Sequence, residues 1–252
     1  MDDLVMGITV NIILAIIEWI IVLTLISRAK KNKINTLYLL AIAIFLEGLA
    51  TIFLNPGNYI FLLAFIFSDI AVWSHLLFIT FTFYKDRKSP IYILLMITVP
   101  ISIVHWYLSG IYDSGLNKTE LFYFTVRLMY SILLFIVYGW MVYSTIKSYL
   151  KFRKNIMIQP WIKARYLLVI TYCLAKISLG VFMHFVPSDS SVDYWAVGVA
   201  VSTVAALTSF IAQFLAWVMP KGFKKWLNRN FSVQKEEEIL SEEELMKQLE
   251  ER

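Results

Sequence analysis

Cysteine, charge and histidine are all scarce in this 252-residue sequence. Its one cysteine, Cys173, excludes a disulfide within the chain. Only 16% of the residues are charged, against about 25% in soluble domains, whereas 59% are hydrophobic and the mean hydropathy is +0.68. The three histidines show neither HxxxH nor HExxH spacing, so no zinc-hydrolase motif is present. These shortages exclude a soluble domain and indicate an integral membrane protein.

The sequence contains long apolar runs. Seven of them reach the ~20 residues that a helix needs to cross a bilayer. They show no period-2 alternation, which favours a helical bundle over a β-barrel. Asp2 and Asp3 precede the first run where a signal peptide would be basic, so we expect a retained helix. The predicted spans are Leu4–Ser27, Ile34–Leu54, Tyr59–Tyr84, Ile91–Ile111, Leu121–Lys147, Ile162–Val186 and Tyr194–Met219.

Positive charge gathers in alternate connecting segments. It follows the first, third and seventh predicted spans, and it brackets the segment between the fifth and the sixth. The other segments contain only Lys118, beside several acidic residues. By the positive-inside rule this asymmetry predicts an external N-terminus and a cytoplasmic C-terminus in the cell membrane. The net charge of +5 is therefore expected to face anionic lipid rather than nucleic acid.

The sequence changes character after Pro220. Phe223, Trp226, Leu227 and Phe231 are spaced as one apolar face with lysines opposite, which predicts an amphipathic helix lying at the membrane surface. An acidic tail follows, in which Ser241 and Glu244 form a capping box. The predicted organisation is a transmembrane domain (1–219), an amphipathic helix (220–231) and an acidic cytoplasmic tail (232–252).

Ionisable side chains inside the predicted spans are the most informative residues. Such groups are costly in a membrane and usually face the protein interior or water. Most of them fall in the outer half of the bundle, and His105 lies near the outer end of the fourth span. Together with two aromatic residues they are the candidates for a ligand site or a polar core: Glu18, Glu47, Asp69, Trp73, His75, Arg127, Tyr172 and Lys176.

Two interpretations of these residues compete. They could form buried salt bridges that hold helices in register, with Lys176 paired to Asp69 or Glu47. Alternatively, they could line a wet pocket that opens to the outside. We find no catalytic motif, no metal-ligand cluster and no Gly-rich phosphate loop. The seventh span lacks the Schiff-base lysine that retinal requires, so no cofactor is predicted.

The layout of residues 1–231 resembles that of rhodopsin and the G-protein-coupled receptors. It is also similar to the seven-helix sensor modules at the N-termini of prokaryotic histidine kinases. Asp86-Arg87-Lys88 after the third span is similar to the receptors' acidic-Arg-Tyr signature, whereas the NPxxY and CWxP motifs are absent. The prokaryotic sensor type fits better, although no kinase domain follows.

The resemblance implies a receptor or sensor with a polar pocket in its outer half. It also implies a cytoplasmic protein partner, which we expect to dock through the basic segment 147–163 and the C-terminal tail. A small-solute or ion transporter is the alternative, because Glu18, Glu47, Asp69 and Lys176 could line a path. A scaffold subunit of a membrane complex is a third possibility.

Overall fold

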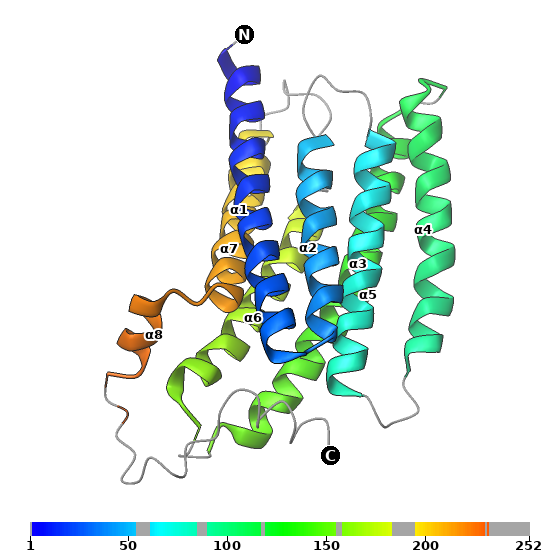
Figure 1. Ribbon diagram of the computed structural model, residues 1–252. Helices are drawn as coiled ribbons and strands as arrows, with labels where there is room; N and C mark the ends of the chain where they lie inside the picture. Colours follow the sequence, from blue (N-terminus) through cyan, green and yellow to red (C-terminus); the bar gives the residue numbers. More distant parts are fainter. Residues whose placement is uncertain are drawn as a thin grey trace.

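The computed structural model in Figure 1 describes residues 2–53, 61–84, 90–116, 119–154, 158–182, 195–229 and 231. Within these residues the chain forms helices and no strand. The helices are α1 (Asp2–Asn32), α2 (Thr36–Phe53), α3 (Phe61–Phe83), α4 (Ile91–Asp113), α5 (Glu120–Phe152), α6 (Pro160–Phe182), α7 (Trp195–Trp217) and α8 (Lys221–Leu227). The seven from α1 to α7 are long and apolar enough to cross a membrane. The expected all-helical architecture with seven membrane-length helices is therefore confirmed.

Some predicted features fall on other parts of the chain. The acidic tail 232–252, Lys118 and the Asp86-Arg87-Lys88 signature lie outside the described residues.

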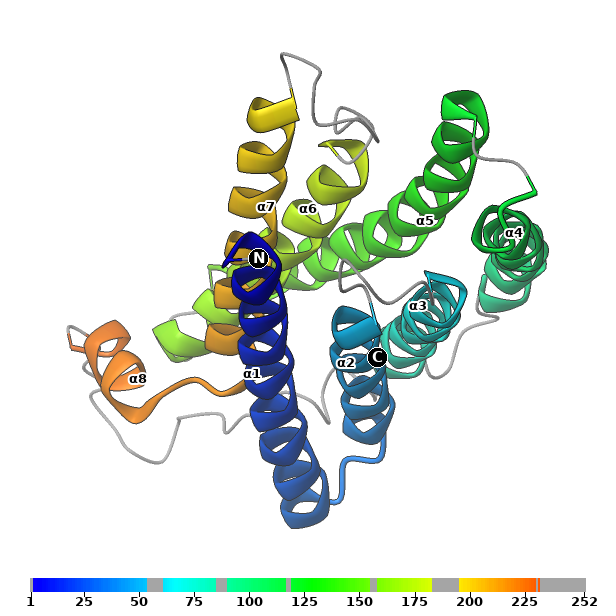
Figure 2. The same ribbon diagram turned by 90° about the horizontal axis from the view of Figure 1, so that it is seen from above.

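Six of the helices close a ring. Contacts run from α1 to α2, from α2 to α3, from α3 to α5, from α5 to α6 and from α6 to α7, and α1 meets α7. The main contacts of helix α4 are with α3 and α5, and the helix lies outside the ring (Figure 2). We call the end of the bundle where α1 begins the N-terminal end, and the opposite end, where α8 follows α7, the α8 end (Figure 1).

The largest differences from the predicted bounds are at the C-terminal ends of α1 and α5. Helix α1 continues past Ser27 and ends at Asn32. The next residue, Lys33, adopts a left-handed backbone with φ of 55°. The amide of Ile34 then donates to the carbonyl of Ala29 at 3.2 Å, which satisfies a carbonyl that the helix end would leave unpaired. Helix α5 begins beside Thr119, whose hydroxyl accepts from the Phe122 amide at 3.4 Å, and it continues to Phe152.

Helix α8 is short and is anchored to the start of α6. Phe223 and Leu227 pack against a small apolar cluster that contains Trp161 and Met219, whereas Trp226 is 55% exposed. The side chain of Asn228, directly after α8, accepts from the backbone amide of Trp161 at 3.3 Å. The predicted apolar face is therefore divided, with part of it buried in the protein and part directed outward.

Candidate functional site

A single carboxylate, Glu47 of α2, lies at the centre of the buried polar groups. It is 3.1 Å from the ammonium of Lys176 on α6, so the structure pairs this lysine with the second of its two expected partners. Tyr138 of α5 donates to the same oxygen at 2.7 Å, and Tyr172 of α6 donates at 3.3 Å. Gln213 of α7 donates to the other oxygen at 3.2 Å. Charge-assisted hydrogen bonds of this kind are the strong ones in proteins.

Helical spacing brings these residues to the interior. The buried side of α2 follows Leu40, Ile44 and Glu47, at intervals of three and four residues. Tyr172 and Lys176 are four residues apart, so they share one face of α6. Each helix therefore presents its polar side chain on the same buried face as its aliphatic core residues.

His75 of α3 extends the group through a tyrosine. Its Nδ1 atom lies 3.0 Å from the carbonyl oxygen of Ala71, so Nδ1 carries a hydrogen. Its Nε2 atom faces the hydroxyl of Tyr172 at 3.2 Å. Both the histidine and the tyrosine are fully buried. We call Glu47, Tyr138, Tyr172, Lys176, Gln213 and His75 the Glu47 network; it connects α2, α3, α5, α6 and α7.

Glu18 of α1 borders the Glu47 network without a hydrogen bond to it. The residue is fully buried, and neither carboxylate oxygen has a hydrogen-bond partner among the described residues. It interacts electrostatically with both Glu47 and Lys176. One of its oxygens lies 3.1 Å from the point where a side chain on Gly48 would begin. The absence of a side chain at Gly48 thus gives this carboxylate its space.

Asp69 belongs to a separate pair. Its carboxylate lies 3.0 Å from Nδ1 of His105 on α4, and both side chains are fully buried. The rings of Phe65 and Tyr130 flank His105, with centroids 4.6 and 5.7 Å away. The pair joins α4, the helix outside the ring, to α3. Lys176 is therefore not the partner of Asp69.

Two further candidates lie apart from the Glu47 network. Trp73 of α3 faces Trp106 of α4, with ring centroids 5.5 Å apart. Arg127 of α5 stacks on Tyr123, with its guanidinium 3.9 Å from the ring centroid, and donates to that tyrosine's hydroxyl. The structure thus brings Glu18, Glu47, His75, Tyr172 and Lys176 together and leaves Asp69, Trp73 and Arg127 elsewhere.

The sequence analysis did not single out Tyr138 and Gln213, and it left His105 without a partner. Gln213 carried a usable signal, because an amide within an apolar span tends to hydrogen-bond across helices. Tyr138 carried none, since it is one of 14 tyrosines in a chain rich in aromatic residues. The pairing of His105 needed the depth of the fourth helix relative to the third, which sequence alone does not fix.

An apolar layer separates the Glu47 network from the α8 end. It is built from aliphatic and Met side chains that lie one or two turns closer to that end and are at most 1% exposed. These residues are Ile21 and Leu25 of α1, Leu40 and Ile44 of α2, Ile79 of α3 and Met141 of α5.

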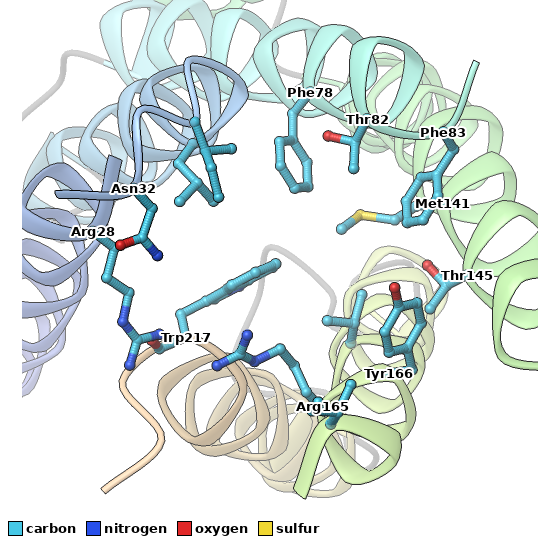
Figure 3. Close-up of a pocket in the computed structure, with 14 residues that line it drawn as sticks. Arg28, Asn32, Phe78, Thr82, Phe83, Met141, Thr145, Arg165, Tyr166 and Trp217 are labelled. Carbon is cyan, nitrogen blue, oxygen red and sulfur yellow. The ribbon is translucent and has the colours of Figure 1, made fainter. Parts of the chain in front are cut away.

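Beyond this layer a cavity of about 90 Å³ opens between the helix ends (Figure 3). Arg28, Phe78, Thr145, Arg165 and Trp217 are among its lining residues, and none of the eight candidate residues is. The pocket expected in the outer half stays a prediction, since this cavity lies at the opposite end from the one where it was expected.

Comparison with protein-family models finds no match for this chain, and comparisons with curated proteins and with solved structures find none either. The function must therefore be argued from the site. Chemically, the Glu47 network is an ion pair with three neutral donors around one carboxylate, and its members come from five different helices. Such an arrangement holds helices in one relative position and can release them when a charge is removed or added.

Proposed function

We propose that the protein is a seven-helix receptor or sensor of the cell membrane, with its N-terminus outside and its C-terminus in the cytoplasm. In this proposal the Glu47 network holds one state of the bundle, and a signal from the outer half changes that state at the α8 end. The observation that carries the proposal is the position of the network, which joins five helices and is closed off from the α8 end by an apolar layer.

The energetic argument concerns the retention of charge in a membrane. An acid or a lysine at the centre of a membrane helix costs about 2.5–3.5 kcal/mol on insertion scales. Helix packing alone needs no such groups, because contacts between small and apolar residues suffice. A buried pair whose members sit on α2 and α6 supports a switching role, since its strength depends on the relative position of two helices.

The apolar layer also bears on the choice between a sensor and a transporter. A path for ions or polar solutes needs polar groups or water along its length. Between Glu47 and the cavity the described interior offers aliphatic residues such as Leu25, Leu40 and Ile79 instead. This layer favours a sensor over a transporter.

The proposal is tested by distance measurements at the α8 end. Spin labels on Y38C of α2 and L167C of α6, both partly exposed positions, would be introduced with C173S in the background. We expect the double variant E47Q/K176M to shift or broaden the distance distribution, and R127Q, which alters a polar group outside the network, to leave it unchanged.

Two results would contradict the proposal. One is a distance distribution that E47Q/K176M leaves identical to that of the parent protein, provided that the variant is folded. The other is a flux of protons, Na⁺ or K⁺ through proteoliposomes that E47Q abolishes, because this result would make the protein a transporter.

The proposed cytoplasmic output involves the basic segment 147–163. Lys147, Lys151, Arg153 and Lys154 are exposed there, and the acidic tail carries the opposite charge. The tail can therefore cover the segment until a partner displaces it. Deleting residues 236–252 should speed maleimide labelling of K154C in nanodiscs at physiological salt but not at 1 M salt, where the Debye length is about 3 Å. If the deletion variant and the full-length protein are labelled at the same rate at physiological salt, the tail does not cover the segment.

A further inference from the structure

The cavity at the α8 end has a chemistry of its own, and it lies outside the Glu47 network. From its lining we infer that it binds a small anionic amphiphile, a ligand with a phosphate or carboxylate head on a short apolar body. The ligand would reach it from the water at the α8 end.

Two arginines give the cavity its positive charge. Arg28 of α1 and Arg165 of α6 both belong to the lining, and none of the 14 lining residues is acidic. Arg28 is held in place because it donates to the carbonyls of Trp217 and Val218 at the end of α7, to the latter at 2.9 Å. The guanidinium of Arg165 lies 4.8 Å from the ring centroid of Trp161. Fixed guanidinium groups are suited to bind a carboxylate or a phosphate.

The positive potential also affects a neighbouring residue of α8. Lys224 lies with its ammonium 3.8 Å from the ring centroid of Trp161. Partial burial, and then the positive charges of Arg165 and Arg28, lower the pKa of Lys224 from its usual range. An anion bound at the two arginines would reduce this repulsion.

Three polar groups of the cavity lining lack hydrogen-bond partners within the described part of the chain. The hydroxyls of Thr82 and Thr145 and the indole N–H of Trp217 are buried, and none has a hydrogen-bond partner among the described residues. Figure 3 shows the two threonines across the cavity from Arg28 and Arg165. Buried donors of this kind are costly unless a ligand or water satisfies them. These three groups therefore point to an occupant with more than one polar atom.

Apolar side chains form most of the remaining wall of the cavity. Phe78, Met141 and Val169 line it, together with the ring of Trp217. A simple inorganic anion would leave these surfaces without contact, whereas a short alkyl or aryl body would cover them. The free volume of about 90 Å³ limits that body to a few carbon atoms.

The location of the lining decides the source of the ligand. The residues come from α1, α2, α3, α5, α6 and α7, so the helix ring surrounds the cavity. Asn32 and Trp217 are the last residues of their helices, and Ile162 lies in the first turn of α6. The cavity is therefore bounded laterally by protein and faces the α8 end, which favours a water-soluble ligand over a bilayer lipid.

Butyl phosphate is a suitable probe. Isothermal titration of the full chain in phosphatidylcholine nanodiscs should show saturable binding of butyl phosphate, with at least tenfold weaker binding of inorganic phosphate and of butanol. R165Q should weaken butyl phosphate binding at least tenfold, and T145V should weaken it less. The control R229Q removes an exposed positive charge that is not part of the lining and should leave the affinity unchanged.

Several outcomes would overturn the inference. Equal affinities for butyl phosphate and inorganic phosphate would show that the apolar body makes no contribution. Equal affinities in the parent, R165Q and R28Q would show that the arginines do not bind the head. V169F should fill the cavity and block binding without removing a charge, so unchanged binding in this folded variant would also contradict the site. If butyl phosphate binds more weakly when the nanodiscs contain phosphatidylglycerol, the anionic lipid competes for the cavity. The natural ligand would then come from the bilayer and not from the water.

Discussion

At the scale of single residues, the carboxyl of Glu47 accounts for most of the polar structure in the bundle. Four side chains donate to it, and one of them, Lys176, also supplies the charge that balances it. Removing one member of a buried ion pair costs about 3–5 kcal/mol in soluble proteins, because the other charge is left without its partner. Replacing both members costs much less.

We therefore expect K176M to lower the free energy of unfolding by about 3 kcal/mol. Adding E47Q should recover at least about 1 kcal/mol of that loss, because the two residues are directly coupled. D69N is the matched control, since Asp69 pairs with His105, and its effect should add to that of K176M. The free energies of unfolding of the single and double variants are measured in mixed micelles. If the effects of E47Q and K176M on this free energy are strictly additive, the two residues are not paired.

A second prediction at this scale concerns Lys224. Because burial and two guanidinium groups lower its pKa, a larger fraction of its amine is neutral at a given pH, and the neutral form is the one that acylates. R165Q should raise the pKa and shift the pH profile of Lys224 acetylation to higher pH. Mass spectrometry of the acetylated peptide over a pH series measures this, and a profile that does not move would show that Arg165 has no effect on Lys224.

At the scale of elements, α1 and α2 come close together at Gly48. A side chain placed there would begin 2.8 Å from Nε1 of Trp19 and 3.1 Å from a carboxylate oxygen of Glu18. Both obstacles belong to α1, so any added atom must push the two helices apart or turn these side chains. The glycine therefore sets how closely α1 approaches the Glu47 network.

G48A should destabilise the protein by about 1–3 kcal/mol, as overpacking of a tight contact does. Gly139 of α5 provides the matched control, because nothing lies within 4 Å of its added carbon. G139A should be neutral or stabilising by up to about 1 kcal/mol, since alanine favours helix. Thermal unfolding of both variants separates the two effects, and equal midpoints would rule out the close contact at Gly48.

The helices themselves were largely predictable from the sequence. The apolar runs located all seven to within a few residues, because a membrane span is determined by composition over ~20 residues rather than by distant contacts. The largest errors are at the C-terminal ends of two helices. Helix α1 ends only where Lys33 adopts a left-handed backbone, and α5 continues through polar residues to Phe152.

The site was less predictable for a geometric reason. Hydropathy gives the depth of a residue only to about a turn, and it does not give the rotation of a helix about its axis. Lys176 therefore had two acidic partners of similar depth, and only the packing of α2 against its neighbours decided for Glu47. His105 likewise had no predicted partner, and the structure buries it fully against Asp69.

At the scale of the whole molecule, the proposed orientation can be tested with single cysteines. Leu116 at the N-terminal end is 81% exposed, and Lys154 beyond α5 is exposed at the α8 end. Lys154 is preferred to Phe152 at the end of α5, because Phe152 is only 6% exposed and a cysteine there would react poorly with the label. In a C173S background we expect an impermeant maleimide to label L116C in intact cells and K154C only after permeabilisation. Labelling of both residues from the same side would overturn the orientation.

The long separation of Glu47 from Lys176 in the sequence affects how the bundle is made. The two residues stand at positions 47 and 176, so chain growth at about 5–20 residues per second leaves the acid without its lysine for on the order of ten seconds. Helix α2 must therefore enter the bilayer unaided. Its ten Leu, Ile and Phe residues supply about 3–6 kcal/mol on the insertion scale, enough to offset the ~3 kcal/mol that an acid costs. Synthesis thus delivers α2 first, and the ion pair closes only after α6 follows it into the membrane.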